Sequence, residues 1–232
     1  MKKQSLFGVF AFALMICLGG ASAHAQDTPK ISIFGGYSYG LNNLGQSTCF
    51  FTCGQGASGL HGYAASATYN ATKNIGFEAN FSGHNGSPIL ASEAPTSTSN
   101  GFEERSAQDV YTYTFGPKVT LPIGNFAAYT HFLVGAMHAH QAFNDTCVPA
   151  TGSTCSGTPD TANLKGTGMA FKTGAGLDWN HGRWGLRILE VDYVHSSIAA
   201  SGTCTPSCGS SISLNVGANN FELATGVTFN IK

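Results

Sequence analysis

Charged side chains are scarce in this chain of 232 residues, because Asp, Glu, Lys and Arg together make up only 10% of it. Eight of them recur on the polar faces of segments whose opposite faces are apolar: Glu78, Lys118, Lys172, Asp178, Arg187, Glu190, Asp192 and Glu222. Five are acidic and three are basic. A charge that leaves bulk water needs a partner of opposite sign. The pattern therefore predicts an internal network of ion pairs, with a charged path for ions as the alternative.

Cysteine chemistry is the second candidate. Six of the seven cysteines form three close pairs in segments rich in Gly, Ser and Thr: Cys49 with Cys53, Cys147 with Cys155, and Cys204 with Cys208. In an exported protein this spacing predicts local disulfide bonds. A metal site built from the C-x3-C spacings is the alternative, but the pairs lie far apart along the chain. We therefore expect three loops that are each stapled by a disulfide.

A His-x-Ser motif, His195-x-Ser197, raises the question of nucleophilic catalysis. It resembles the His-x-Ser element of the outer-membrane lipid A deacylases, in which an acid orients the histidine. Between Ser196 and Phe221 the chain has no Asp or Glu, and Glu222 falls on the opposite face of its segment. We therefore expect a polar strand end here and no enzymatic activity.

Two further histidines, His138 and His140, have the i, i+2 spacing that a metal ion could use, with Asp145 as a third ligand. Histidines without a metal are the simpler interpretation, so we expect no metal and no cofactor. The sequence contains neither a phosphate-binding glycine motif nor a basic, aromatic surface, and we expect no nucleic-acid partner.

The N-terminus has the features of an export signal. A basic start and an apolar stretch (Leu6–Leu18) precede Ala23–Ala25, which has the small-x-small pattern of a cleavage site. This pattern predicts a cleaved signal peptide over residues 1–25. Residues 26–232 are then expected to form a single domain.

Strands must position the candidate residues. The final stretch, 220–232, alternates strictly, with Phe229 and Ile231 on an apolar face and Glu222 on a polar one, which is the period of a strand. The same alternation predicts strands over 31–40, 60–70, 75–82, 109–121, 126–139, 167–179 and 184–195.

Two of these strands carry irregularities. In 184–195 strict alternation would place Arg187 on the face opposite Glu190 and Asp192. One extra residue near Ile188–Leu189, a β-bulge, would bring all three onto one face. Pro117 removes a ladder donor, so we expect it near the end of its strand or at a bulge.

The connections between the expected strands alternate between short and long. Three are short turns, over 71–74, 122–125 and 180–183, and four are long loops, including a polar loop over 83–108. Strands that span a bilayer need a closed sheet, because lipid cannot satisfy an open edge. We therefore predict an all-β fold: an eight-stranded antiparallel up-and-down transmembrane β-barrel with three short periplasmic turns and four long extracellular loops. A soluble barrel is disfavoured, because the few charges could not coat its exterior.

Three segments carry a family resemblance: Phe34–Ser38 (FGGYS), Tyr113–Lys118 (YTFGPK) and Arg187–Tyr193 (RILEVDY). In this order the chain resembles the OmpA-like outer-membrane β-barrel domain family, in the small form seen in acidobacteria. The resemblance implies insertion into the bacterial outer membrane by its assembly machinery, among lipid and lipopolysaccharide. Because the sequence ends at Lys232, we expect no peptidoglycan-binding domain to follow the barrel.

The C-terminal residues Gly226, Phe229 and Ile231 have the spacing of the signal that this machinery reads. The family resemblance further implies a structural or surface-interaction role, such as adhesion or binding. The stapled loops would face an extracellular partner of unknown identity, and charged residues would plug the lumen. The alternatives are a lipid-modifying enzyme of the deacylase type and a narrow channel.

Overall fold

The computed structural model describes residues 28–42, 58–97, 99–155, 161–205 and 212–231. Within these ranges the chain forms nine strands: β1 (Ile31–Asn42), β2 (Ser58–Asn70), β3 (Ile75–Gly86), β4 (Ile89–Glu93), β5 (Gly101–Ile123), β6 (Phe126–Val148), β7 (Thr161–His181), β8 (Trp184–Thr205) and β9 (Ile212–Ile231). In the part of the chain so described, no helix is long and apolar enough to cross a membrane. The predicted signal peptide, residues 1–25, lies outside the described residues.

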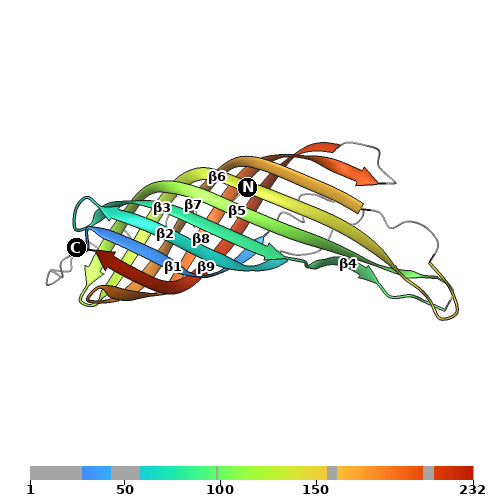
Figure 1. Cartoon of the computed structure of the whole chain (residues 1–232), viewed down its shortest axis with the longest axis horizontal. Coiled ribbons are helices and arrows are strands. Elements are labelled where there is room, and N and C mark those ends of the chain that lie inside the picture. Colours follow the sequence, from blue (N-terminus) through green and yellow to red (C-terminus); the bar gives the residue numbers. More distant parts are fainter. Residues whose placement is uncertain (1–27, 43–57, 98, 156–160, 206–211, 232) are drawn as a thin grey trace, which may run out of the picture.

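The strand pairings close on themselves. The order runs β3-β2-β1-β9-β8-β7-β6-β5, and β5 also pairs with β3. All of these pairings are antiparallel, so eight strands form a barrel (Figure 1). The last strand pairs with the first from Ile31 opposite Ile231 to Leu41 opposite Phe221. The predicted eight-stranded antiparallel barrel, closed by its C-terminal strand, is confirmed.

Two of the short turns are two-residue connections, each of which begins with a glycine. Gly124 has φ +57° and Gly182 has φ +66°, backbone conformations that L side chains rarely adopt. Both tight connections lie at the end of the barrel where β1 begins and β9 ends, which we call the short-turn end. The opposite end is the long-loop end.

The polar loop predicted over 83–108 is wrong. In its place β3 continues to Gly86, β5 begins at Gly101, and β4 pairs with β5 outside the barrel. Figure 1 shows β4 beside the long extensions of β5 and β6, which reach past the other strands at the long-loop end. One face of the β5 extension is buried, but it carries the polar residues Glu104, Ser106 and Gln108, so this stretch lacks the apolar alternation that identified the other strands.

The exterior of the barrel is apolar. Phe115, Met169 and Trp184 are 65%, 62% and 61% exposed, although a side chain of this kind is usually buried. Outward aromatic rings pack on one another near both ends: Trp184 lies 5.0 Å from Phe229, and Phe81 lies 4.9 Å from Tyr113. A soluble barrel has the reverse arrangement, with an apolar interior and a charged exterior.

The interior has two layers. Toward the long-loop end it holds an apolar cluster formed by Leu60, Val110, Met137, Ala139, Ala170, Val194, Ile198, Ala200, Val216 and Ala218. Toward the short-turn end the same strands turn polar and charged residues inward. The polar layer contains the candidate site.

Pro117 lies inside β5, six positions before the strand ends at Ile123. The ladder between β5 and β6 runs from Phe115 opposite Val134 to Lys118 opposite His131 without a change of register. The expectation of a strand end or a bulge at Pro117 is therefore wrong. The proline interrupts pairing with β6 locally, and the ladder resumes on either side.

Candidate functional site

A β-bulge in β8 positions three of the charged residues. On the β9 side Arg187 pairs with Gly226 and Glu190 pairs with Ala224, so two residues of β8 lie opposite one of β9. Ile188 and Leu189 both face outward, at 42% and 46% exposure. The bulge predicted at this place is confirmed, and it directs Arg187, Glu190 and Asp192 into the lumen.

Arg187 is the centre of the first group of contacts. Its Nη1 donates to Glu190 Oε2 at 2.6 Å and its Nε donates to Asp178 Oδ1 at 3.1 Å. The hydroxyl of Tyr129 also donates to Glu190 Oε2. The guanidinium carbon lies 3.9 Å from the centroid of the Phe34 ring, a cation–π contact in a buried setting. Arg187 is therefore neutralised by carboxylates on one side and stacked on an aromatic ring on another.

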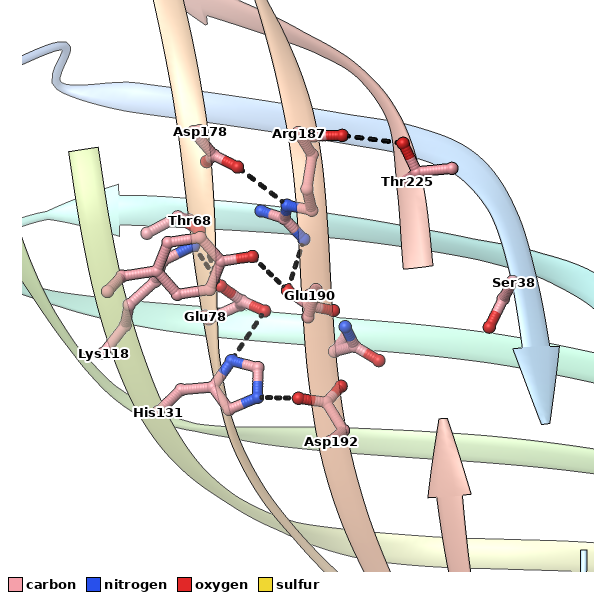
Figure 2. A network of polar contacts seen from close by, with 12 residues as sticks. Ser38, Thr68, Glu78, Lys118, His131, Asp178, Arg187, Glu190, Asp192 and Thr225 are labelled. Carbon is pink, nitrogen blue, oxygen red and sulfur yellow. Dashed lines mark hydrogen bonds and ion pairs between the residues drawn. The ribbon is translucent and has the colours of Figure 1, made fainter. Parts of the chain in front are cut away.

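Lys118 and Glu78 form the second group. Lys118 Nζ lies 2.7 Å from Glu78 Oε2, which also accepts a hydrogen bond from Thr68 Oγ1 at 3.1 Å. The ammonium group lies 3.8 Å from the centroid of the Tyr129 ring. Figure 2 shows Lys118 and Thr68 reaching Glu78 from different strands.

Lys172 joins the two remaining carboxylates. Its Nζ lies 3.0 Å from Asp192 Oδ2, 3.0 Å from Glu222 Oε2 and 3.0 Å from Asn80 Oδ1. Glu222 Oε1 accepts a hydrogen bond from Ser38, whose hydroxyl also contacts His84 Nε2 at 2.8 Å. All eight charged residues that the sequence singled out thus lie in the lumen, and they form one continuous network.

His131 also belongs to this network, although no role was predicted for it. Its Nε2 lies 2.9 Å from Asp192 Oδ1 and its Nδ1 lies 3.5 Å from Glu78 Oε1 (Figure 2). The ring therefore bridges the Lys118 group and the Lys172 group. His131 alternates with Tyr129 and Leu133 on the buried face of β6, and this period-two pattern is the signal from which its role could have been inferred.

Two glycines in β7 leave space for the network. A Cβ atom at Gly174 would overlap Asp192 Oδ1, and a Cβ atom at Gly176 would overlap the phenol ring of Tyr129. Large polar side chains can fill the narrow lumen only because β7 presents no side chain at these two points.

A cavity of about 110 Å³ lies at the short-turn end of the network. Its lining includes Lys118, Tyr129, Asp178 and Arg187. The charged groups therefore border a solvent-sized space on this side, whereas the apolar cluster covers them on the other.

Comparisons with known proteins complete this description. No protein-family model and no curated protein matches the chain. Solved structures are similar to it in fold. One is Ail, the attachment invasion locus protein of Yersinia pestis, with a TM-score of 0.48, 15% identity and coverage of 87% of this chain and 99% of that one. Neisserial surface protein A has a TM-score of 0.42, 10% identity and coverage of 87% and 96%. Outer membrane protein AlkL has a TM-score of 0.39, 15% identity and coverage of 92% and 95%.

The His-x-Ser motif does not assemble a triad in the described residues. His195 and Ser197 both face outward on β8, and His195 Nδ1 contacts Asn219 Oδ1 at 2.8 Å. Asn219 also accepts a hydrogen bond from the hydroxyl of Tyr193 at 2.6 Å. An amide therefore occupies the place where a catalytic acid would be needed.

The second histidine motif contacts two neutral side chains and one carboxylate, since His140 Nδ1 lies 3.6 Å from Asp109 Oδ2. His138 Nδ1 contacts Thr167 Oγ1 at 2.8 Å, and His140 Nε2 contacts Asn163 Oδ1 at 2.7 Å. Among the residues that the structure describes, these histidines and Asp145 do not form a group of metal-ligand atoms.

One of the three expected cysteine pairs is present as a disulfide, Cys147–Cys155, with a Cα–Cα distance of 6.1 Å. Cys204 lies in β8, while Cys49, Cys53 and Cys208 lie outside the described residues. The corresponding two bonds stay predictions.

The residues of the predicted assembly signal lie on the closing strand. Phe229 and Ile231 face outward near the short-turn end, and Phe229 packs edge-on against Trp184. Gly226 faces inward opposite Gly36, where a Cβ atom would overlap the backbone of β1. This glycine permits close contact between the first and last strands.

Proposed function

We propose that the chain is a small, non-enzymatic β-barrel protein of the bacterial outer membrane that presents a rigid β-structure to an extracellular partner. Its apolar exterior and closed strand order support the location, because a lipid-exposed sheet must have no open edge. By the rule for such barrels, the short-turn end faces the periplasm and the long-loop end faces outward. Lipid and lipopolysaccharide would contact the apolar band, and the assembly machinery would recognise β9.

The packed interior of the barrel supports a role in surface interaction and disfavours a role as an ion channel. Lys172, Glu190 and Asp192 are fully buried, and Arg187 is 1% exposed. These charges are held by several partners each, so an ion passing through would have to break buried ion pairs. The apolar cluster, which includes Leu60 and Met137, fills the next layer of the lumen. We therefore propose that the lumen is plugged.

The observation that carries the proposal is a projection at the long-loop end, formed by β4 and by the parts of β5 and β6 that reach past the other strands (Figure 1). The strands β5 and β6 each have 23 residues, about twice the length needed to cross a bilayer. They pair along nearly all of this length, from Gly101 opposite Val148 to Ile123 opposite Phe126. The disulfide Cys147–Cys155 joins two residues that are eight positions apart at the tip. Paired strands and a staple make a preformed surface, which lowers the entropic cost of binding.

The edge of the projection favours recognition through side chains. β4 has five residues, follows Pro88 closely, ends near Pro95, and has an irregular register between Ile89 and Ala91. Short, bulged strands beside prolines are poor templates for an added strand. A partner would therefore contact the outward side chains of β4, β5 and β6.

A trimmed variant tests the proposal. Gly86 lies opposite Gln108, and Gln141 lies opposite Leu164, so an Asn-Gly turn can replace 87–107 and another can replace 142–163 while the barrel ladders stay intact. Cells that display the wild-type barrel or the trimmed barrel are treated with a cleavable cross-linker in their natural medium, and captured molecules are identified by mass spectrometry.

We expect specific capture by the wild type and its loss in the trimmed variant. The double variant C147S/C155S keeps the residues of the projection but removes the staple, and we expect weaker capture. Equal capture by all three proteins would contradict the proposal. A steady single-channel current through the purified wild type in planar bilayers would contradict the plugged lumen.

The enzymatic alternative has a direct test of its own. Ser197→Ala should leave the acylation of lipid A unchanged in cells that express the barrel, because His195 is held by Asn219 and by no carboxylate in the described residues. A change of lipid A acylation that depends on Ser197 would establish an enzyme and refute the non-enzymatic role.

A further inference from the structure

Three atoms of metal-ligand type converge inside the lumen: Glu78 Oε1, His131 Nδ1 and Glu190 Oε1. Glu190 Oε1 has no hydrogen-bond partner among the described residues, while Glu78 Oε1 and His131 Nδ1 lie 3.5 Å apart as an ion pair without hydrogen-bond geometry. The side chains of all three residues are fully buried. Their ligand atoms lie within 4.8 Å of one another. Figure 2 shows the three side chains directed toward the same region from β3, β6 and β8. A buried polar atom that lacks a partner is costly, and the unpartnered Glu190 Oε1 beside the loosely paired Glu78 Oε1 and His131 Nδ1 indicates a common ligand.

The charge of the network indicates the sign of that ligand. The lumenal network contains five carboxylates, and the three cations Lys118, Lys172 and Arg187 pair with them. The carboxylates outnumber these cations by two, and a metal ion bound at His131 Nδ1 would occupy the place of a ring proton and leave the imidazole uncharged. A buried site that bulk water does not reach does not tolerate such an excess of negative charge. One divalent cation would balance it.

We propose that Glu78, His131 and Glu190 bind a divalent metal ion in the lumen, with Zn²⁺ as the best match. One imidazole and two carboxylates form a donor set of nitrogen and oxygen atoms, which suits zinc. Zinc–ligand bonds are about 2.1 Å long, so the three ligand atoms would have to lie about 1 Å closer to one another than they do in this structure. The carboxylates sit on flexible stems that permit such a movement.

Each proposed ligand is held in place through its other polar atom. His131 Nε2 lies 2.9 Å from Asp192 Oδ1, which orients the ring and leaves Nδ1 toward the centre. Glu78 Oε2 is held by Lys118 at 2.7 Å, and Glu190 Oε2 is held by Arg187 at 2.6 Å. Supporting contacts of this kind orient the ligands of metal sites, and a carboxylate on the second nitrogen of a histidine is common among them.

The cavity of about 110 Å³ at the short-turn end supplies a route for the ion. It is lined by Tyr129, Lys118 and Arg187, and each of these side chains contacts Glu78 or Glu190. A water molecule could therefore reach the metal from the periplasmic side and complete its coordination. The bound ion would tie β3, β6 and β8 together across the lumen.

Metal content of the folded full-length barrel tests the proposal. The protein is stripped with EDTA in detergent micelles, equilibrated with excess Zn²⁺, dialysed, and measured by plasma mass spectrometry. We expect about one zinc per wild-type chain, and loss of stoichiometric zinc in H131Q and in E190Q. D192N, which alters only the supporting contact, should bind zinc about 10- to 100-fold more weakly. The control H138A/H140A removes outward histidines and should retain the full amount.

Heat-modifiable mobility in gels confirms that each variant is folded before it is assayed. If a lumenal variant does not fold, the zinc X-ray absorption spectrum of the H138A/H140A protein identifies the ligands instead. We expect it to show one imidazole together with oxygen ligands. Failure of the folded wild type to retain zinc would overturn the proposal, since protons on the histidines or Glu190 would then balance the charge. Full retention of zinc in folded H131Q and E190Q would also overturn it, because the ion would lie elsewhere.

Discussion

Replacing Lys172 with Met tests whether the lumenal charges act as a paired network. Met has a similar length and no charge, so the substitution removes the cation with little change of volume. Lys172 is fully buried and lies 3.0 Å from a carboxylate oxygen of both Asp192 and Glu222. Its loss leaves two carboxylates without their main cation in a part of the protein that bulk water does not reach.

The expected cost follows from these contacts. Removing one partner of a buried ion pair typically destabilises a protein by about 3–5 kcal/mol. Lys172 serves two carboxylates and also donates to Asn80 Oδ1 at 3.0 Å, so we expect the upper part of this range. Adding Glu222→Gln removes one of the stranded charges and should recover about 1–2 kcal/mol, because the two residues are in direct contact.

Denaturant unfolding in lipid vesicles measures this cost. Trp179 and Trp184 are exposed on the outer face of the barrel, so their fluorescence reports loss of contact with lipid. Lys165→Met is the matched control, because Lys165 lies on the same strand but is exposed. We expect its unfolding midpoint to equal that of the wild type. If Lys172→Met also unfolds at the wild-type midpoint, the lumen is hydrated enough to screen its charges, and the paired network is refuted.

Three further substitutions test other parts of the structure. Gly176→Val should destabilise the barrel by about 1–3 kcal/mol, because the new side chain would overlap Tyr129. Gly35→Val is the control and should not destabilise it, because a Cβ atom there meets nothing within 4 Å. Equal unfolding midpoints for the two variants would contradict the packing of β7. Deletion of Leu189 should remove the bulge and leave membrane insertion intact. Deletion of Val191 should turn Glu190 toward lipid and block membrane insertion. The reverse result, measured by heat-modifiable mobility in gels, would refute the register of β8. F229D/I231D should be exported but should not insert, and normal heat-modifiable mobility of this variant would contradict the role of β9.

Period-two alternation allowed the barrel and the faces of its strands to be predicted. An apolar exterior and a polar lumen differ so strongly that even the bulge at Ile188–Leu189 is visible as a break of the period. Beyond the apolar band the buried face of β5 carries polar residues such as Glu104, Ser106 and Gln108, and this contrast between the two faces disappears. For that reason β4 and the outer parts of β5 and β6 were taken for a loop.

The contacts inside the lumen could not be predicted in the same way. Alternation indicates which face a residue occupies, but its depth depends on how each strand is staggered around the barrel. Lys172 on β7 reaches Glu222 on β9 and Asn80 on β3, and no local pattern relates these positions. His131 was overlooked because an imidazole carries no fixed charge, although its two nitrogens allow it to join carboxylates on two different strands.

The two layers of the lumen oppose different permeants. Water and ions could enter the cavity at the short-turn end and reach the network, where Lys118 and Arg187 hold the carboxylates. Beyond the network they meet the apolar cluster around Leu60 and Met137, which would have to move aside to let them pass. An apolar solute could enter that cluster but would then meet buried charges. Because the layers lie in series, a conducting path would require both to rearrange together. This arrangement favours a barrel that holds the projection rigidly over a barrel that acts as a channel.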